Sequence, residues 1–384
     1  MSLVTLNTGS SSVKFAAFSD DGATRAFRGE ISSIGREAQL RLSRAGGEER
    51  RETLGALSHR DAVARACEIL AEASGDTVRA VGHRIVHGGA HFDRAVRIDA
   101  DAEAKLRALI PLAPSHQPHN LSGIEAAGRL FPHALQIGAF DTAFHRAQPF
   151  LADAYALPRR YYEDGIRRYG FHGLSYDYLS GRLAELEGER RAVLAHLGSG
   201  ASLCAVKGRA PFGSTMGLTA LDGLPMSTRC GRIDPGAVLH LMENGLNREE
   251  VSRLLYSESG LKGLSGLSGD MRALERSEAP EAEQAIAYFA ERCRIEIAGL
   301  AAALQGIDAL VFSAGIGENS ARIRRQVCEG LSWLGVEIDE AANANAGRET
   351  RISTEASRVA VWVIATDEEA VIARDVARVL AGRG

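Results

Sequence analysis

The sequence predicts an α/β protein built from two similar domains. Three observations support this prediction: the chain has 384 residues, apolar strand-like runs alternate with helix-periodic segments, and one strand–turn–strand pattern occurs twice, half a chain length apart. A chain of this length can form two hydrophobic cores, and alternating strands and helices are typical of α/β domains. Segment 148–158 contains two prolines, so we expect domains at residues 1–150 and 151–367.

Composition and charge are ordinary for a globular protein. Hydrophobic residues make up 45% of the chain, charged residues 24%, and the net charge is −4, which argues against a nucleic-acid surface or a polybasic membrane anchor. The five cysteines form no CxxC motif, which argues against a disulfide framework or a zinc site. The N-terminus lacks the features of a signal peptide, and no apolar run is long enough for a membrane span. We therefore expect a cytoplasmic protein.

The first strand–turn–strand pattern contains a candidate phosphate-binding turn. The apolar run Leu3–Leu6 breaks at Asn7 into small residues and resumes as Val13–Phe18, which indicates a hairpin. Gly9 allows a ligand to approach the backbone, the serine hydroxyls can donate hydrogen bonds, and Lys14 adds positive charge. The pattern GxxxxGK[ST] is absent, so this is not a Walker A loop. From these residues alone, an ordinary serine-rich hairpin is an equally good interpretation.

The rest of the first half continues as strands and helices. After two further strands, helix-periodic segments precede the later apolar runs, which predicts an antiparallel unit followed by strand–helix alternation. The expected elements are strands 24–31 and 38–42, helix 60–73, strand 79–86, helices 101–109 and 121–130, and strand 134–140.

The second half repeats the pattern, because strand 191–197 breaks at small residues and resumes at 203–207. An offset of 189 residues aligns Gly9 with Gly198, Ser10 with Ser199, Val4 with Val193 and Ala16 with Ala205. We interpret this as a duplicated domain with one phosphate-facing hairpin in each copy; two unrelated small-residue turns are the alternative. The other expected elements are helix 174–186, a glycine-rich loop region 213–236, helices 236–244, 248–256 and 281–304, strand 309–313, a following helix, strand 358–364 and a last helix from residue 368.

Two glycine-rich segments follow predicted strands. Gly315–Asn319 comes between a strand and a helix, where glycines let a flat ligand or phosphate approach the backbone beside a helix N-terminus. His196–Gly200 suggests a similar phosphate loop. Each signal is weak alone, since a strand-to-helix turn often needs glycine for structural reasons.

Five polar residues are individual candidates for ligand contact. Arg84 ends a buried strand, where a guanidinium suits capture of a carboxylate or phosphate; without further context, a surface or structural arginine is the better interpretation. Asp141 directly follows a buried strand, where α/β folds often bind ligands, although it could equally cap the next turn. His116 lies in a proline-pinned loop, which is often mere packing. His172 and Arg229 lie in glycine-flanked loops, which favour ligand contact over a solvated face.

Ten motifs, read together, carry a family resemblance. The chain resembles the acetokinase family, the acetate kinases, within the sugar kinase, heat-shock ATPase and actin superfamily. Each motif is weak or moderate alone, but together they follow the family's order over essentially the whole length. They are LNTGSSSVK, GHRIVHGG, PLAPSHQPHN, FDTAFH, RYGFHG, HLGSGAS, STRCGRIDP, GLSGDMR, SAGIGEN and TDEEAVIARD.

The resemblance implies both a fold and an activity. The implied fold is a pair of duplicated ribonuclease H-like domains of the actin-like ATPase superfamily, with a nucleotide cleft between them and the last helix, about 368–384, packing on the first. The implied activity is that of an acetate kinase: Mg²⁺-dependent, reversible, in-line transfer of the γ-phosphoryl group of ATP to acetate, giving acetyl phosphate and ADP. The implied metal is Mg²⁺ or Mn²⁺, the partners are these small molecules, and the assembly is a homodimer, with no nucleic-acid or membrane partner.

The resemblance also implies four sets of site residues. The catalytic set is Asp141, His172, Arg229 and His116. The acid-binding set is Arg84, Val86 and Phe171. The metal-binding set is Asn7 and Glu368. The nucleotide-binding set is Lys14, Ser10, Ser12, His196, Leu197, Gly198, Ser199, Gly200, Asp270, Met271, Arg272, Gly315, Ile316, Gly317, Glu318 and Asn319.

The chain departs from the family pattern at several positions. Ser115 and Ala220 stand where the family lines the pocket for the acid's methyl group, and both are smaller than the usual residues. We therefore expect some tolerance for larger acids such as propionate, with acetate preferred. The departures whose effect stays open are Ser199, Asp222, Ser227 and Arg232.

Three alternatives accompany this reading. The first is a propionate or butyrate kinase on the same scaffold. The second is a chaperone-like or otherwise non-enzymatic nucleotide-binding member of the superfamily, which would keep both hairpins but would not need the arginines, the aspartate and His172 together. The third is a metal hydrolase built on His83, His87 and His91, which recur every four residues as a metal-binding helix face would require. The surrounding residues are strand-like, and the glycines after His87 would end a helix.

Overall fold

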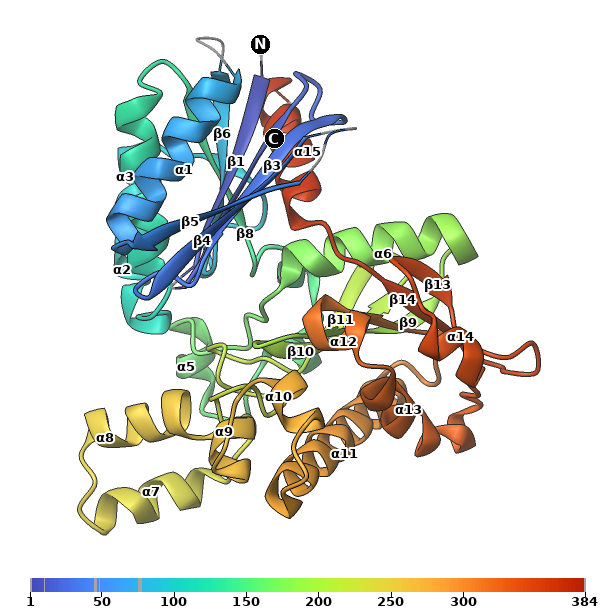
Figure 1. Cartoon of the computed structure of the whole chain (residues 1–384). Helices are drawn as coiled ribbons and strands as arrows, with labels where there is room; N and C mark the ends of the chain where they lie inside the picture. The colour runs from blue at the N-terminus through green and yellow to red at the C-terminus, as the bar shows by residue number, and fades with distance from the viewer. Residues whose placement is uncertain (1, 10, 45–46, 48, 75–77, 383–384) are drawn as a thin grey trace. The chain divides into compact units, whose positions relative to one another are not determined.

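The computed structural model describes residues 2–9, 11–44, 47, 49–74 and 78–382, and the chain divides into two compact units (Figure 1). Unit 1 comprises Met1–Arg146 together with Asp367–Gly384, and unit 2 comprises Ala147–Thr366. In the part of the chain that the structure describes, no helix is long and apolar enough to cross a membrane.

Unit 1 is built on a mixed sheet. Its strands follow the order β5-β4-β3-β2-β1-β6-β8-β7, with β1 antiparallel to β2 and parallel to β6, and β6 parallel to β8. The parallel strands are flanked by helices, as expected for α/β folds. The bounds are β1 (Ser2–Thr8), β2 (Val13–Phe18), β3 (Arg25–Ser32), β4 (Glu37–Arg44), β5 (Arg50–Ala56), β6 (Val78–Ile85), β7 (Val96–Arg97) and β8 (Leu135–Phe140).

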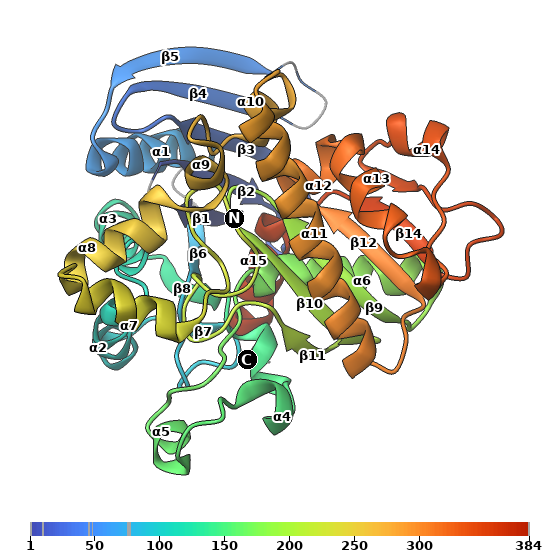
Figure 2. The same cartoon turned by 90° about the horizontal axis from the view of Figure 1, so that it is seen from below.

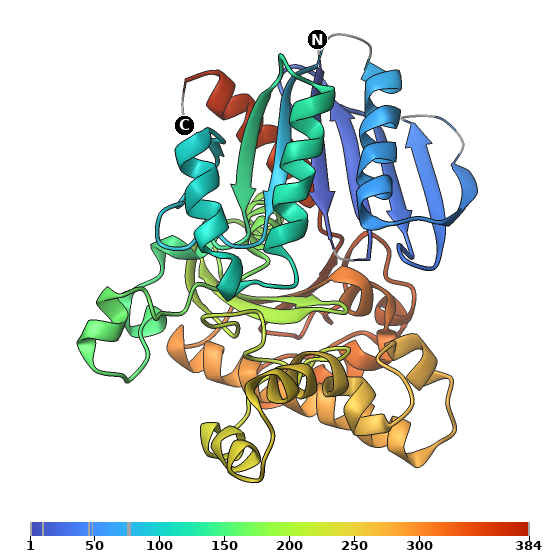
Figure 3. The same cartoon turned by 90° about the vertical axis from the view of Figure 1, so that its left-hand side faces the viewer.

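Helices cover both faces of this sheet. Figure 3 shows α1, α2 and α3 on one side and α15 on the other. On the α15 side, a Cβ at Gly82 of β6 would lie 2.6 Å from methyl groups of Ile372 and Val376, so only glycine lets α15 pack this closely. The bounds are α1 (His59–Ser74), α2 (Ala100–Ala108), α3 (Gln117–Leu130) and α15 (Glu368–Leu380), with short 3₁₀ turns at Ile110–Leu112 and Phe144–Ala147.

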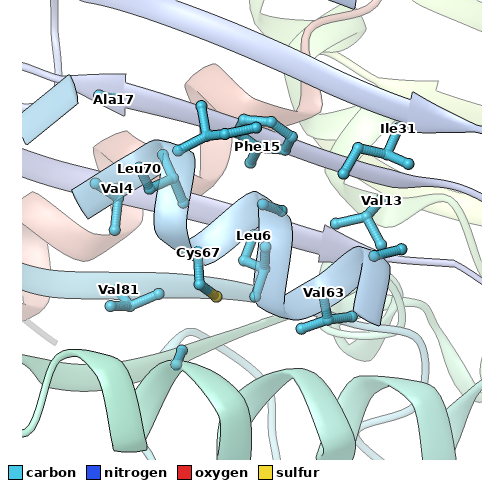
Figure 4. Packing of buried hydrophobic residues seen from close by; sticks show 14 of the residues in the cluster. Val4, Leu6, Val13, Phe15, Ala17, Ile31, Val63, Cys67, Leu70 and Val81 are labelled. Atoms are coloured by element: carbon cyan, nitrogen blue, oxygen red, sulfur yellow. The ribbon is translucent and has the colours of Figure 1, made fainter. Parts of the chain in front are cut away.

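The core of unit 1 fills the space between the sheet and α1. Residues that alternate along β1, such as Val4 and Leu6, point toward α1, where Val63, Cys67 and Leu70 meet them (Figure 4). This period-two pattern leaves the intervening positions of β1 on the α15 side. The strand therefore presents Asn7 to α15 while its neighbours stay buried in the core.

Unit 2 has a sheet of the same plan with a different set of helices around it. Its sheet has the order β11-β10-β9-β12-β14-β13, and α6 and α11 lie on opposite faces of it (Figures 1 and 2). The strands are β9 (Arg191–Leu197), β10 (Ala201–Lys207), β11 (Ala210–Ser214), β12 (Ala309–Ser313), β13 (Glu349–Arg351) and β14 (Ala360–Ile364). The helices are α4 (Phe150–Asp153), α5 (Arg159–Glu163), α6 (Gly173–Glu187), α7 (Pro235–Glu243), α8 (Arg248–Arg253), α9 (Gly260–Ser265), α10 (Met271–Glu275), α11 (Pro280–Ala303), α12 (Ala314–Asn319), α13 (Ala321–Glu329) and α14 (Glu340–Ala344), with a π-helical turn at Leu254–Glu258 and a 3₁₀ turn at Ser332–Leu334.

The predicted α/β fold with a duplicated domain is confirmed by the topology. The strand order β3-β2-β1-β6-β8 of unit 1 matches β11-β10-β9-β12-β14 of unit 2, with the same parallel and antiparallel relations. Strand β9 starts and ends 189 residues after β1. The predicted match of Ala16 with Ala205 is wrong by one residue. Ala16 pairs with Thr5, and the equivalent partner in unit 2 is Cys204, because the second hairpin turn is one residue shorter.

Four strands lie outside the predicted elements, and all are at or near sheet edges. Strands β5 and β13 alternate weakly and are mostly exposed, β7 has two residues, and β11 begins just before the predicted glycine-rich loop. Edge strands bury one side at most, so their apolar pattern is faint.

Candidate active site

Three polar side chains of unit 1 meet at the carboxyl ends of neighbouring strands: Asn7, Arg84 and Asp141. They lie at the ends of β1, β6 and β8, which are parallel neighbours. The Arg84 guanidinium donates from Nε to Asp141 Oδ1 (2.9 Å) and from Nη2 to Asp141 Oδ2 (2.6 Å). Its remaining nitrogen, Nη1, donates to Asn7 Oδ1 at 3.2 Å. The strand ends thus form a planar, bidentate arginine–carboxylate pair.

The first residue of α15 joins this cluster from the opposite end of the chain. Glu368 Oε2 lies 3.5 Å from Arg84 Nε. Asp367 fixes the start of the helix, because its carboxylate accepts a hydrogen bond from Ala370 N at 3.0 Å and also pairs with Arg25. An N-cap held in this way gives the following carboxylate a defined place.

Burial and neighbouring charges set the ionisation of the cluster. The Asp141 side chain is 1% exposed, and burial raises its pKa to about 6 although Arg84 opposes the rise. Burial disfavours the charge of Arg84, but the carboxylates of Asp141, Glu368 and Glu369 outweigh burial and raise its pKa. At pH 7 Arg84 and Asp141 therefore form an ion pair, with the Glu368 side chain beside it.

The first hairpin brings a second cation to the same side of the sheet. Lys14 pairs directly with Asn7 across the hairpin, and directly paired residues project from the same face. Lys14 attracts Glu369, the second residue of α15: burial raises the pKa of Glu369, and the lysine partly offsets the rise.

The turn of this hairpin is held from both sides. Gly9 N–H donates to Ser12 O at 2.8 Å, and Gly9 O accepts from His59 Nε2 at 2.9 Å. The His59 ring lies 4.1 Å from that of His119, and burial lowers the pKa of both imidazoles. Ser10, also predicted to bind nucleotide, lies outside the described residues.

Two polar residues outside the predicted set connect these strand ends through hydrogen bonds. Asn120 of α3 is 2% exposed; it accepts from Val86 N (3.0 Å) and donates to Thr8 O (2.9 Å), so it ties the end of β6 to the end of β1. Gly88 N donates to Thr142 Oγ1 at 3.0 Å, which ties the same loop to the end of β8. The available signal for Asn120 was a carboxamide on the apolar face of a helix-periodic segment, where a buried polar group must be hydrogen-bonded.

The oxygens around Arg84 fit a magnesium ion. Asn7, Asp141 and Glu368 offer one carboxamide and two carboxylates, and Mg²⁺ is usually bound through one or two carboxylates together with water and substrate phosphates. No group of three or more His, Cys, Asp or Glu side chains suited to a metal exists within the described ranges. His83, from the histidine trio of the third alternative, is buried in β6, where its Nε2 lies 2.7 Å from Gln136 Oε1.

In unit 2, the second hairpin turn lies against α12. Gly198 N donates to Gly200 O at 3.1 Å, and a Cβ at Gly198 would lie 3.7 Å from Ala314 Cβ and 3.9 Å from Gly315 N. The two predicted nucleotide segments, HLGSG and SAGIGEN, therefore adjoin each other. Leu197, the last residue of β9, is buried beneath the turn.

Residues 314–319 form a short helix, whereas the sequence predicts an open turn. Ala314 N donates to Glu318 Oε1 (2.8 Å), and Asn319 Nδ2 donates to Gly315 O (2.9 Å), so these polar side chains close the helix on itself. The buried guanidinium of Arg324 donates to the carbonyls of Gly317 and Glu318, between Ile316 and Asn319. These bonds hold the end of the helix. Glycine in a helix is a weak signal, because local bonds of this kind override low propensity.

Two predicted residues of unit 2 lie beside Gly200, and a third stacks on one of them. A Cβ at Gly200 would lie 3.4 Å from His172 Nε2 and 3.9 Å from Arg229 Nη1. Arg229 Nη1 donates to Ala220 O at 3.1 Å, and burial lowers the pKa of this arginine. The rings of His172 and His196 stack, with centroids 4.1 Å apart and planes 17° from parallel. A guanidinium and an imidazole thus point at one small patch of backbone, where an anion can be bound.

The other predicted residues are distributed as follows. Asp270 caps α10 by accepting from Arg272 N (2.9 Å) and also pairs with its guanidinium, while Met271 is buried. His116 is half-buried at the N-cap position of α3 in unit 1. Val86 is buried in unit 1 and Phe171 is buried in unit 2.

The departures from the family pattern have local partners. Asp222 Oδ2 accepts from Arg168 Nη1 at 2.9 Å, and Arg232 Nη1 lies 2.9 Å from Glu296 Oε1 on α11. Ser227 N donates to Ser199 O at 3.1 Å, so two of the substituted positions hold each other. Ser115 is exposed.

The chain is similar to known proteins in both sequence and structure. The model of the acetokinase family matches residues 2–374. An acetate kinase of Methylocella silvestris is 49% identical over 390 residues, covering 97% of this chain and 96% of the relative. The crystal structure of Porphyromonas gingivalis acetate kinase has a TM-score of 0.86 at 36% identity and covers 99% of both chains. A propionate kinase from Francisella tularensis has a TM-score of 0.89 at 36% identity, covering 97% of this chain and 98% of that one.

Proposed function

We propose a function from one premise: the chain belongs to the acetokinase family. The protein is an acetate kinase, which transfers the γ-phosphoryl group of ATP to acetate and returns it from acetyl phosphate to ADP. One observation carries this conclusion: the ends of β1, β6 and β8 gather Asn7, Arg84 and Asp141 beside Glu368. A fixed guanidinium among oxygen ligands suits a reaction that joins a carboxylate to a phosphoryl group carried with Mg²⁺.

The chemistry requires position and charge more than acid–base catalysis. Acetate is already ionised at pH 7, like the carboxylates of proteins, so no proton has to be removed to make it a nucleophile. The barrier comes from bringing two anions into line, which arginines, an imidazole, a lysine and a divalent ion can lower. Residues of this kind occur in both units, with Arg84 and Lys14 in unit 1 and His172 and Arg229 in unit 2.

The roles proposed for the site residues combine these contacts with the family pattern. Arg84 binds the acid or acyl-phosphate end, and Asp141 fixes the orientation of its guanidinium through two hydrogen bonds. His172 and Arg229 stabilise the transferring phosphoryl group, and His116 lies near it. Val86 and Phe171 bind the acid, and the nucleotide phosphates and base are bound by Lys14 and the segments at 196–200, 270–272 and 315–319.

Asn7 and Glu368 hold the divalent ion, which supplies charge neutralisation at the phosphates. We propose Mg²⁺ as that ion, with Mn²⁺ as a substitute; turnover of the chelated enzyme after adding back each ion tests this choice. We also propose that the two compact units are the two domains, and that the enzyme is a cytoplasmic homodimer. All five cysteines are free thiols, which suits a reducing compartment. Analytical ultracentrifugation of the purified protein tests the dimer.

A second candidate function, that of a propionate kinase, differs from the first in its acyl-chain preference. The propionate kinase of Francisella tularensis matches this chain as well in structure as the acetate kinase does. Ser115 and Ala220 stand where the family lines the pocket for the methyl group of the acid. Small side chains there reduce discrimination against one additional methylene, which is worth only about 10–200-fold even in a tight pocket.

A phosphorylation assay with purified protein tests both candidates. Acetate, propionate and butyrate are each supplied with MgATP, and the acyl phosphate is trapped with hydroxylamine. We expect the highest kcat/KM with acetate and measurable turnover of propionate. The double variant Ser115→Leu/Ala220→Pro, which restores the bulk usual for the family, should lose propionate activity selectively. Higher kcat/KM for propionate would assign the second candidate, and no acyl phosphate with any acid would reject both.

A further inference from the structure

A hydrogen-bonded chain of three side chains leads from the interior of unit 2 to His172. Tyr176 Oη lies 2.5 Å from Ser202 Oγ, and Ser202 Oγ lies 2.8 Å from His172 Nδ1. Tyr176 and Ser202 are both fully buried. Neither belongs to the site residues considered so far, and α6 and β10 bring them together from positions 26 residues apart.

The imidazole at the end of this chain is held in a demanding conformation. His172 occupies the N-cap position of α6 with φ 57° and ψ 24°, in the left-handed region that non-glycine residues rarely adopt. Such a backbone persists only when its surroundings fix it, and it often marks a functional position. On one side the ring stacks on His196, whose own Nδ1 lies 2.9 Å from Ser175 Oγ. The ring plane is therefore fixed by stacking and its rotation by Ser202.

The inner end of the chain limits the direction of its protons. A backbone hydrogen bond links His196 to Tyr176, and burial raises the pKa of Tyr176 well above its usual value, so the phenol keeps a proton to donate. One arrangement consistent with the distances has Tyr176 O–H donating to Ser202 Oγ and the Ser202 hydroxyl donating to His172 Nδ1. Each hydroxyl then both donates and accepts, the arrangement in which hydrogen bonds reinforce one another.

We propose that Tyr176 and Ser202 are positioning residues that hold His172 as the neutral tautomer protonated at Nε2. This inference rests on the proposed function for its catalytic meaning. Because Nδ1 accepts from Ser202, Nε2 carries the proton and faces the backbone at Gly200, beside Arg229. An N–H preset toward that point can donate to an oxygen of the transferring phosphoryl group without reorienting, which is how preorganised donors stabilise a transition state.

The tautomer itself can be observed without any activity. Full-length protein labelled with ¹⁵N in its imidazole rings is studied by long-range ¹H–¹⁵N NMR at neutral pH, and the His172 signals are assigned by their loss in His172→Gln. We expect Nδ1 unprotonated and Nε2 protonated in the wild type, with a mixture of tautomers in Tyr176→Phe and Ser202→Ala. A wild-type ring protonated at Nδ1 would overturn the proposal, whatever the enzyme turns over.

Kinetics then separates positioning from simple structural support. Tyr176→Phe removes only a hydroxyl; we expect kcat to fall roughly 10- to 100-fold, as for other groups that orient a functional histidine, while the KM values for ATP and acetate change little. In a His172→Ala background the same substitution should have almost no further effect, because a shared pathway makes the losses non-additive. Ser180→Ala, which removes another buried hydroxyl on α6 whose partner is Asp177 O, is the matched control with unchanged kcat.

The outcomes distinguish this proposal from the proposed function. If wild-type protein forms no acyl phosphate, the proposed function fails, and the NMR result still decides the tautomer. If kcat falls equally in Tyr176→Phe and Ser180→Ala, or falls additively with His172→Ala, the effect is structural and the proposal is wrong. Ser202→Thr, which keeps the hydroxyl, should retain the wild-type tautomer.

Discussion

The two units of this protein place different chemistry on the same backbone plan. Asn7 in β1 and His196 in β9 occupy equivalent positions, and each faces the first residues of a helix: Glu368 of α15 in unit 1, and His172 at the start of α6 in unit 2. In unit 1 the contacts are ionic and converge on Arg84. In unit 2 they pass through hydroxyl groups and stacked imidazoles.

The strand pairing extends this comparison to the central residues. From the register of β6 on β1 and of β12 on β9, Arg84 corresponds to Ser313; from β8 and β14, Asp141 corresponds to Thr366. The duplicated framework therefore carries an arginine–aspartate pair in one copy and two small hydroxyl residues in the other. We infer that the framework fixes where side chains meet, whereas the residue types divide the work between binding charge and donating hydrogen bonds.

Loss of α15 should have the largest effect, because it removes one whole side of the cluster in unit 1. A chain ending at Thr366 exposes the face of the sheet that Val371, Ile372 and Val376 bury. Each such side chain contributes about 1.5–3 kcal/mol, a large part of a typical stability of about 5–15 kcal/mol. We expect no measurable turnover and loss of cooperative unfolding by circular dichroism. A chain ending at Gly382 is the control, and turnover in the truncated chain would contradict the assigned role of Glu368.

The next largest effects are expected from substituting one arginine in each unit, and they should differ in the loss of stability. Arg84→Ala should lower kcat about 10²–10³-fold, as for loss of a preorganised charged contact. It should also destabilise the protein by about 3–5 kcal/mol, because Asp141 is left buried without a partner. Arg229→Ala should lower kcat comparably with a smaller loss of stability, since Arg229 is bound to a neutral carbonyl.

Guanidinium chloride unfolding and initial rates measure both effects. The double variant Arg84→Ala/Asp141→Asn should recover stability but not turnover. Arg182→Ala breaks an exposed pair with Glu349 and should cost about 0.2–1 kcal/mol. Equal destabilisation by Arg84→Ala and Arg229→Ala would contradict the distinction between an arginine bound to a carboxylate and one bound to a neutral carbonyl.

Buried asparagines provide a smaller, matched test. Asn120→Ala in unit 1 should cost about 1–3 kcal/mol by leaving backbone groups of Thr8 and Val86 unsatisfied, and should raise the KM for acetate. Asn343→Ala in unit 2 should cost about the same, because it removes the acceptor of Arg324 Nε and the donor to Ala321 O. It loosens the guanidinium that holds the end of α12, and should raise the KM for ATP instead. Thermal unfolding and separate KM values measure the two effects. The same KM response in both variants would contradict the proposed roles of Val86 in acid binding and of α12 in nucleotide binding.

The pH dependence should be the mildest probe. Asp141 has a pKa of about 6, so kcat/KM should fall as the pH drops below about 6, when protonation removes the partner of Arg84. The sign for stability is opposite: a carboxyl whose folded pKa lies above its usual value binds protons more tightly when folded, so its contribution to stability increases as the pH falls from about 6 to about 4. Activity should therefore decline before any unfolding is seen. In Asp141→Asn the pH dependence in this range should vanish.

Much of the frame was predictable from the sequence because it depends on local patterns. The apolar runs of β1, β2, β9 and β12 are buried on both faces, and turns of small residues mark the hairpins, so both copies stand out. The repeat at half the chain length and the ordered motifs then indicated the fold and the activity. Arg84, near the end of a buried strand, and Asp141, just after another, were candidates by position, each with a structural interpretation beside it; the structure brings them together.

The remaining parts depend on contacts between distant segments, which one sequence does not display. Asn120 differs from a solvated helix residue only because Thr8 and Val86 lie against it in the fold. Tyr176 matches the pattern of a core aromatic, and its role appears only when Ser202 of β10 comes within hydrogen-bonding distance. The slip between Ala16 and Ala205 had the same origin, since turn length is decided by backbone geometry.

Helix α15 follows β14 of unit 2 but packs on the sheet of unit 1. This return of the chain to its first unit has a consequence for biosynthesis. Domains emerging from the ribosome usually fold from the N-terminus onward, but unit 1 lacks Glu368 and the cover of one face until residues 368–380 are made. The nascent chain therefore keeps its first sheet half-covered until α15 has been synthesised, and the contact between Glu368 and Arg84 can form only then.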